Sequence, residues 1–281
     1  MNRISTADIA ALALVFLASC AVSQGQDETS TGTALTQLEA ANALNPNALN
    51  PNALNPNALN PNALNPNALD PGSLSQAALS ALRDPGEAGD LSRELLNYVV
   101  SCAFTPAQSF RFSWTDQAGS VHEELYPGLI GLAPSWSNKP LGQTDQQWVS
   151  ACLASRTNWY GISVTISSRG SHQAIDKAGA PELSTYTRQE GAFWGNLFDS
   201  SPYLHACHDD ASHARSLSRA CAAGHLDENG DVEECGMIHV VGPCDSHCLP
   251  LNQRGMYYPS CVNNLTGSPD ATTRVITVFL P

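Results

Sequence analysis

Four histidines in the C-terminal part of the chain are the residues whose type and spacing best suit metal chemistry. They are His205, His208, His213 and His225. Cys207, Asp209 and Asp210 lie among them, and imidazole, thiolate and carboxylate groups all bind zinc. A zinc ion held there could activate a water molecule for hydrolysis. The spacing matches no zinc signature, and the metalloprotease pattern His-Glu-x-x-His is absent. The alternative is a loop closed by a disulfide from Cys207 to Cys221, with solvated histidines.

Two further patterns could hold a cation. Cys244 and Cys248 lie beside His247, but two thiols at this spacing also form disulfides in an oxidising compartment. The acidic segment 227–234 places carboxylates around Gly230, and calcium favours oxygen-rich loops of this kind. Its order differs from that of an EF-hand loop, so a plain acidic turn is the alternative. We weigh zinc and calcium as cofactors on these grounds and expect neither.

Motifs for nucleophilic catalysis do not occur. The sequence contains neither Gly-x-Ser-x-Gly nor Ser-x-x-Lys, and it has no glycine-rich phosphate loop. Glu123 and Glu124 are adjacent on a predicted strand, so their side chains face opposite ways and do not form the carboxylate pair of a glycosidase. The sequence therefore favours a non-catalytic role.

Trp136 is the candidate for direct ligand contact. It lies in the polar, proline-containing segment 133–138. An exposed tryptophan there could stack on a sugar or anchor a peptide. Packing into the core is the alternative for so large an apolar side chain.

The N-terminus has the pattern of an export signal. Arg3 precedes an apolar run at residues 9–17, which is too short to span a membrane. The run ends in Leu17-Ala18-Ser19-Cys20, which resembles the lipobox of bacterial lipoproteins. The resemblance implies that residues 1–19 are a signal peptide and that Cys20 carries the lipid that anchors the protein to a membrane. Ordinary cleavage and secretion without a lipid is the alternative.

The resemblance also implies a location. Ala21, directly after the lipobox, is similar to the sorting residue of outer-membrane lipoproteins. We therefore expect the protein in the cell envelope, lipid-anchored at the outer membrane, on its periplasmic face or at the cell surface.

The cysteine count agrees with export. The chain has nine cysteines, and setting Cys20 aside leaves an even number, which is typical of a disulfide framework in an oxidising compartment. These are Cys102, Cys152, Cys207, Cys221, Cys235, Cys244, Cys248 and Cys261. Cys102 and Cys152 each lie on the apolar stripe of a predicted helix, so we expect them to pair and to join the two helices.

Two segments of low complexity follow Cys20. Residues 20–41 are small and polar, so we expect them to be disordered. Residues 42–72 repeat the unit Asn-Ala-Leu-Asn-Pro, and proline in every unit excludes a continuous helix. We expect a tether that spans about 30 Å as a coil and about 90 Å when extended. A pentapeptide-repeat solenoid is the alternative, but proline removes a ladder N–H in each unit.

Residues 73–281 are expected to form one globular domain of the α+β class. Helices are predicted at 73–83, at 90–103, from a capping box at Thr144, and as a short helical segment at 215–222. A hairpin is predicted at 110–125, and strands at 160–168, 191–198, 237–241 and 273–280. The expected architecture is N-terminal helices packed on a small antiparallel sheet, followed by a loop-rich, disulfide-bridged C-terminal part.

Charge narrows the choice of partners. The formal net charge is −13, from 13 basic and 26 acidic residues, so phosphate backbones would be repelled and no nucleic-acid partner is expected. Our leading hypothesis is a membrane-anchored, non-catalytic envelope protein that presents a binding or structural domain to a glycan, a peptide or a partner protein. The runner-up is a secreted, metal-dependent hydrolase that uses the His205–His225 region.

Overall fold

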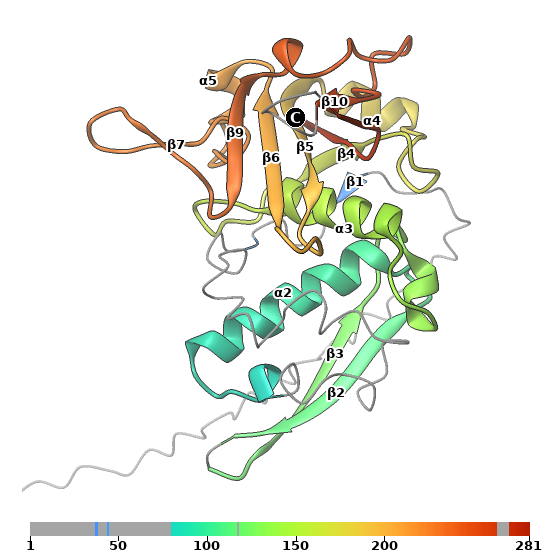
Figure 1. Cartoon of the computed structure of the whole chain (residues 1–281), viewed down its shortest axis with the longest axis vertical. Coiled ribbons are helices and arrows are strands. Elements are labelled where there is room, and N and C mark those ends of the chain that lie inside the picture. The colour runs from blue at the N-terminus through green and yellow to red at the C-terminus, as the bar shows by residue number, and fades with distance from the viewer. Residues whose placement is uncertain (1–36, 39–43, 45–79, 117, 263–269) are drawn as a thin grey trace, which may run out of the picture. The chain divides into compact units, whose positions relative to one another are not determined.

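A six-stranded sheet forms the centre of the fold. The computed structural model describes residues 37–38, 44, 80–116, 118–262 and 270–281. In sheet order, the strands are β1 (Gln37–Leu38), β4 (Ile166–Arg169), β12 (Ile276–Leu280), β5 (Arg188–Asn196), β6 (Tyr203–His208) and β9 (Ile238–Pro243) (Figure 1). Neighbouring strands are antiparallel except β6 and β9, which run parallel. The α+β prediction is confirmed, with one parallel pair that was not expected.

The middle of the sheet is buried on both faces. Residues 190–196 of β5 and all of β12 are buried. Phe193 belongs to the larger apolar core, whereas its neighbours Ala192 and Trp194 pack into a second core on the other face. Because side chains alternate along a strand, a continuous buried run requires cover on both sides. This explains why β5 is apolar and aromatic without polar alternation.

Two helices stack on one face of the sheet. Helix α3 (Gln143–Arg156) packs against β5 and β12, and α2 (Glu87–Ala103) packs on α3 (Figure 1). The disulfide between Cys102 and Cys152 joins the two helices, as predicted. Helix α3 begins after Gly142 without a side-chain cap, so the predicted capping box at Thr144 is wrong.

A hairpin of β2 (Ser109–Thr115) and β3 (Val121–Pro127) packs against α2. Alternate residues of β2 are buried, as their spacing predicted; these are Phe110, Phe112 and Trp114. Arg93 of α2 lies over the Trp114 ring, 4.1 Å from its centre. The same guanidinium donates hydrogen bonds to the backbone carbonyls of Leu82 and Asp84. One arginine therefore links the hairpin, α2 and the chain that precedes it.

Two neighbouring disulfides lie in the second core. One joins Cys207 on β6 to Cys244 at the start of η4 (Cys244–Ser246), and the other joins Cys248 to Cys261 on β10 (Cys261–Val262). The sulfur atoms of Cys207 and Cys248 are 3.8 Å apart. Covalent links therefore hold together the loops that cover this face.

The fourth disulfide joins Cys221 to Cys235, on the side of the larger core. All eight cysteines predicted to form disulfides are therefore bridged. The specific pairing of Cys207 with Cys221 is wrong, because Cys207 lies on the opposite face of the sheet from Cys221.

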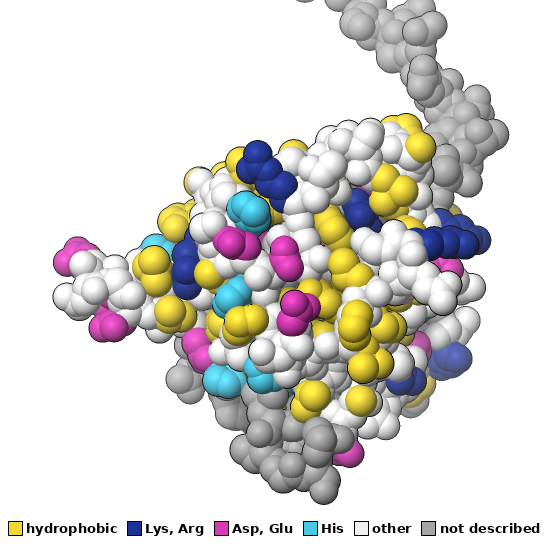
Figure 2. Space-filling view, turned by 90° about the horizontal axis from the view of Figure 1, so that it is seen from above, with side chains coloured by type: hydrophobic (Ala, Val, Ile, Leu, Met, Phe, Trp, Pro, Cys, Tyr) yellow, Lys and Arg dark blue, Asp and Glu magenta, His cyan; other side chains and the backbone are white. Residues whose placement is uncertain are grey.

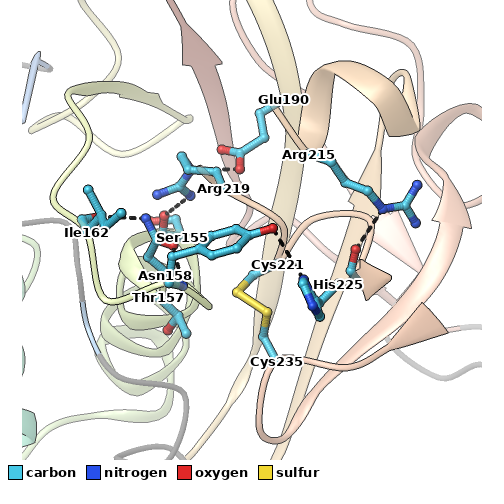
Figure 3. Close-up of a disulfide and its surroundings, with 12 residues drawn as sticks. Ser155, Thr157, Asn158, Ile162, Glu190, Arg215, Arg219, Cys221, His225 and Cys235 are labelled. Carbon is cyan, nitrogen blue, oxygen red and sulfur yellow. Dashed lines mark hydrogen bonds and ion pairs between the residues drawn. A yellow bond between two sulfur atoms is a disulfide. The ribbon is translucent and has the colours of Figure 1, made fainter. Parts of the chain in front are cut away.

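A buried ion pair joins the sheet to α3 (Figure 3). Arg219 Nε lies 2.7 Å from Oε1 of Glu190 on β5, and the two residues are 1% and 0% exposed. Arg219 Nη2 also donates to the carbonyl of Ser155, near the end of α3, at 2.8 Å. Burial raises the pKa of the Glu190 carboxyl, and the charge of Arg219 opposes that shift. The loop that carries Arg219 is thereby tied to two other elements.

The remaining elements are short. They are η3 (Pro134–Ser137), α4 (Ala180–Thr185), α5 (Ala211–Ala214), β7 (His225–Leu226), β8 (Val232–Glu233) and β11 (Ala271–Thr272). β7 pairs with β8, and β10 pairs with β11.

Three predicted elements differ from the structure. The strand predicted at 160–168 begins at Ile166, because the Asn158 side chain holds a turn by donating to the carbonyl of Ile162. The helical segment predicted at 215–222 lies instead at residues 211–214, where Asp210 caps α5. The last strand begins at Ile276 and lies between β4 and β5, not at the edge of the sheet.

Parts of the N-terminal segments belong to the fold. β1 pairs with β4, and the backbone of Leu44 bonds to residues 156 and 158. Residues 37–38 and 44 are thus bonded to the domain, and the disordered segment and the tether stay predictions for the rest of residues 20–72. Residues 1–36, which include the lipobox and Cys20, and residues 45–79 lie outside the described part of the chain. Lipidation at Cys20 therefore stays a prediction.

Replacing Arg219 by methionine should lower the free energy of unfolding by about 3–5 kcal/mol, because Glu190 would be left as an unpaired buried charge. Urea denaturation measures the loss. The double variant Glu190→Leu with Arg219→Met should recover part of it, since no charge then remains buried. Arg188→Met, at an exposed position on the same strand, is the matched control. Equal stabilities of Arg219→Met and this control would contradict a stabilising role for the pair.

Candidate functional site

The four histidines of the predicted zinc site are spread over three elements. His205 and His208 lie on β6, three residues apart, so they point to opposite faces of the sheet. His213 lies on α5 and His225 on β7. Within the described residues, no group of three or more His, Cys, Asp or Glu side chains is arranged to hold a metal ion. The predicted zinc site is therefore not formed by these residues.

Cysteine thiolates are not free to complete such a site. Cys207 is bridged to Cys244, and Cys248 is bridged to Cys261. The pattern of Cys244, His247 and Cys248 therefore reflects two adjacent disulfides and not a zinc motif.

His225 has a packing role. Its ring stacks on Trp159 at 4.5 Å between ring centres, and its Nδ1 lies 3.3 Å from the Tyr160 hydroxyl. Arg215 donates to the carbonyls of Ala223 and Gly224, directly before His225. These contacts fasten the base of the β7–β8 hairpin to the turn after α3.

The acidic segment predicted as a calcium loop is the turn of that hairpin. The Asp227 carboxylate accepts hydrogen bonds from the backbone N–H groups of Asn229 and Asp231, each at 2.8 Å. These bonds lower the pKa of Asp227. The carboxylate thus stabilises its own turn, as in the alternative interpretation.

Trp136 is fully buried, so the prediction that it is exposed for ligand binding is wrong. It lies in η3 with 0% of its surface exposed, and its ring packs against Phe104 at 5.6 Å between centres. The alternative, packing in the core, describes it correctly.

Carboxylates and histidines gather on the face seen in Figure 2, where β6 ends. Burial and the nearby charges of Asp245 and Asp210 raise the pKa of Asp209. Burial lowers the pKa of His208, as does the charge of Arg215. We assign this cluster no ligand, because its aspartates are exposed to water and Asp210 is engaged as the cap of α5.

A polar pocket of about 400 Å³ among the described residues is a candidate ligand site. Its lining residues are Asp176, Asn252, Gln253, Arg254, Met256 and Tyr257. All but Asp176 come from one tight turn between Cys248 and Cys261. Sequence reasoning missed this site, although the polar run Asn252-Gln253-Arg254-Gly255 between apolar residues is typical of an exposed turn.

Hydrogen bonds between residues of the turn itself hold it rigid. Asn252 Oδ1 accepts from the N–H of Met256 at 2.9 Å, and the Asn252 N–H donates to the carbonyl of Tyr257 at 2.9 Å. Gly255 has a φ of +64°, a conformation that favours glycine. The backbone is thus satisfied within the turn, while the Gln253 and Arg254 side chains are exposed to solvent.

Asp176 contributes a carboxylate to the lining of the pocket. Its Oδ1 is buried and has no hydrogen-bond partner in the described part of the protein. A carboxylate in the lining can accept hydrogen bonds from the donors of a ligand. With Arg254 and Gln253 as donors, the pocket can bind a molecule rich in hydroxyl groups or one carrying both donors and acceptors.

A second cavity, of about 220 Å³, lies between α2 and the end of the hairpin. Arg156 lies over the Tyr98 ring there, 4.5 Å from its centre, and burial lowers the pKa of Arg156 to about 10. Leu125, Pro127 and Leu129 complete a mostly apolar lining. Its small volume makes it the weaker candidate.

No protein-family model, curated protein or solved structure matches this chain. In the described ranges, no helix has the length and apolar character required to cross a membrane. The function therefore has to be argued from the geometry of the chain itself.

Replacing Asp210 by alanine should destabilise the protein near pH 6 but much less near pH 2. Hydrogen bonds from Ser212 and His213 lower the pKa of Asp210 from 3.8 to about 2. A carboxyl with a lowered pKa stabilises the folded state above its ordinary pKa, and the contribution is lost as pH falls through the lowered value.

Urea denaturation midpoints measured across this pH range test the effect. Glu233→Ala, at an exposed position on β8, is the control. Its midpoint should differ from that of the wild type by the same amount at every pH. A difference in midpoint between Asp210→Ala and the wild type that is the same at all pH values would contradict the stabilising role of the ionised Asp210 cap.

Proposed function

We propose that this protein is a lipid-anchored, non-catalytic protein of the cell envelope, and that its disulfide-bridged domain binds a saccharide. The lipobox-like Leu17-Ala18-Ser19-Cys20 sequence supports the anchor and the envelope location. The polar pocket at Asp176 supports the binding role.

The single observation that carries the binding role is that the side chains of Asp176, Gln253 and Arg254 line one polar pocket. A carboxylate accepts hydrogen bonds from sugar hydroxyls, whereas the Arg254 guanidinium and the Gln253 amide can donate to sugar oxygens. Tyr257 and Met256 add apolar surface for the faces of a sugar ring. A volume of about 400 Å³ suits a ligand of one or two sugar units.

Disulfides suit this role because they fix the pocket before a ligand arrives. The Cys248–Cys261 bridge brackets the turn, and the Tyr258 hydroxyl accepts from the Gln189 side chain of β5 at 2.8 Å. The Tyr258 N–H also donates to Thr277 of β12 at 2.9 Å. A preorganised pocket loses less entropy on binding. We do not propose the metal-dependent hydrolase, because its four histidines are spread over three elements and the two on β6 point to opposite faces of the sheet.

Binding to an immobilised panel of envelope saccharides tests the proposal. Asp176→Asn should weaken binding of any captured saccharide about 10- to 100-fold, because a hydrogen bond to a charged acceptor contributes about 1.5–3 kcal/mol. Glu228→Gln, which makes the same change of charge in the exposed β7–β8 turn, should bind like the wild type. Equal affinities of the two variants would place binding elsewhere, and no captured saccharide would contradict the proposed ligand class.

The anchor has its own test. Cys20→Ala should move the protein from the membrane fraction to the soluble fraction, because the acyl chains supply the membrane affinity. Ser23→Ala, three residues away, is the control and should stay with the membranes. Unchanged partitioning of Cys20→Ala would contradict the lipoprotein assignment.

A further inference from the structure

Leu44, in the first Asn-Ala-Leu-Asn-Pro unit, is docked on the domain through its backbone. Its N–H donates to the carbonyl of Arg156 at 3.2 Å, and its carbonyl accepts from the N–H of Asn158 at 3.0 Å. Leu44 therefore forms a parallel bridge with Thr157, directly after α3. Two hydrogen bonds fix the position of one residue of the repeat.

The Leu44 side chain is fully buried in the larger core, with 0% of its surface exposed. Burial of a leucine side chain makes a large contribution to stability. The docked residue is thus recognised by both its apolar side chain and its main-chain polar groups.

Hydrogen bonds within the receiving segment hold it rigid without help from Leu44. The Thr157 hydroxyl donates to the carbonyl of Leu153 at 2.9 Å. The Asn158 side chain donates to the carbonyl of Ile162 at 2.6 Å and accepts from the N–H of Tyr160 at 3.0 Å. Arg219 binds the carbonyl of Ser155 just before this segment. The acceptor at residue 156 and the donor at residue 158 are therefore preorganised.

Every copy of the repeat carries the features that are recognised. The corresponding leucines are Leu44, Leu49, Leu54, Leu59, Leu64 and Leu69. Each follows alanine and lies two residues before proline, so each keeps the backbone N–H that the site requires. The chain thus offers six similar ligands to one site; the unit of Leu44 follows Ala41 where the others follow proline, and Leu69 precedes Asp70 where the others precede asparagine.

We propose that residues 156–158 form a docking site for the Asn-Ala-Leu-Asn-Pro unit, and that successive copies of the unit in the same chain exchange in it. Moving from one copy to the next shifts the docked point by one unit of the repeat. The length of chain between β1 and the docked point then changes in steps of five residues. The site would thereby set how much of the repeat lies before the docked point and how much lies after it.

Loop closure predicts which copy is preferred. Residues 39–43 join β1 to Leu44, and residues 39–48 would join β1 to Leu49, so the connection doubles in length. A doubling disfavours closure only about threefold. Leaving the site empty lowers the stability far more than the longer connection does. A buried Leu→Ala replacement lowers the ratio of folded to unfolded protein about 30-fold or more. Leu44 is therefore preferred, and Leu49 is a ready substitute.

Urea denaturation of four full-length proteins tests the exchange. Leu44→Ala should lower the folded-to-unfolded ratio only about threefold, because Leu49 takes the site. Replacing all six leucines by alanine should lower it about 30-fold or more. The matched control keeps Leu44 and replaces the other five, and it should stay within about twofold of the wild type.

Three results would overturn the inference. A loss of about 30-fold for Leu44→Ala alone would mean that no other copy can dock. A wild-type stability for the sixfold variant would mean that docking contributes nothing. A stability of Leu44→Ala that rises with protein concentration would mean that a second molecule fills the site. If the sixfold variant does not fold, adding Leu49→Ala to Leu44→Ala is decisive, because exchange predicts a further loss of less than threefold.

Discussion

The buried ion pair between Arg219 and Glu190 is the interaction on which the arrangement of the other parts depends. Two charges removed from water are tolerated only when each finds a partner. Arg219 meets this requirement by binding both the carboxylate of β5 and the Ser155 carbonyl of α3. The loop that carries Arg219 must therefore lie between the sheet and the end of α3.

The pair leaves Glu190 Oε2 and Arg219 Nη1 without hydrogen-bond partners among the described residues. Such groups are costly when buried, so the surrounding structure has to compensate. Covalent support lies close by, since Cys221, two residues after Arg219, is bridged to Cys235. The segment after Ser155 then receives Leu44, so the position of the first repeat depends on the same contact.

The periodic spacing of apolar residues predicted the elements that bury one face and expose the other. Helix α2 and strand β2 each bury one face, and the spacing of Leu95, Val99, Phe110 and Phe112 is sufficient to show it. The pairing of Cys102 with Cys152 was predictable because each lies on the buried stripe of a long helix. These are local patterns that need no knowledge of how distant segments meet.

The remaining features depend on contacts between distant segments. Cys207 and His205 lie on one face of β6, whereas Ala206 and His208 lie on the other, and only the sheet order shows that each face is covered. Leu44 carries no local pattern that separates it from Leu49, because the units around them are the same. Asp176 and Arg254 are far apart in sequence, so their shared pocket could not be inferred from spacing.

The disulfides and the polar pocket illustrate how a chain with few charged residues fixes the position of a polar turn. The segment that carries Asn252 and Arg254 has little regular structure of its own. It is fixed at its ends by the Cys248–Cys261 bridge, and Tyr258 fastens it to Gln189 of β5 and Thr277 of β12. Because those contacts hold the backbone, the Gln253 and Arg254 side chains are left exposed to solvent. In the function that we propose, the cysteines therefore act through rigidity, and the polar residues that they hold in place supply the contacts to a ligand.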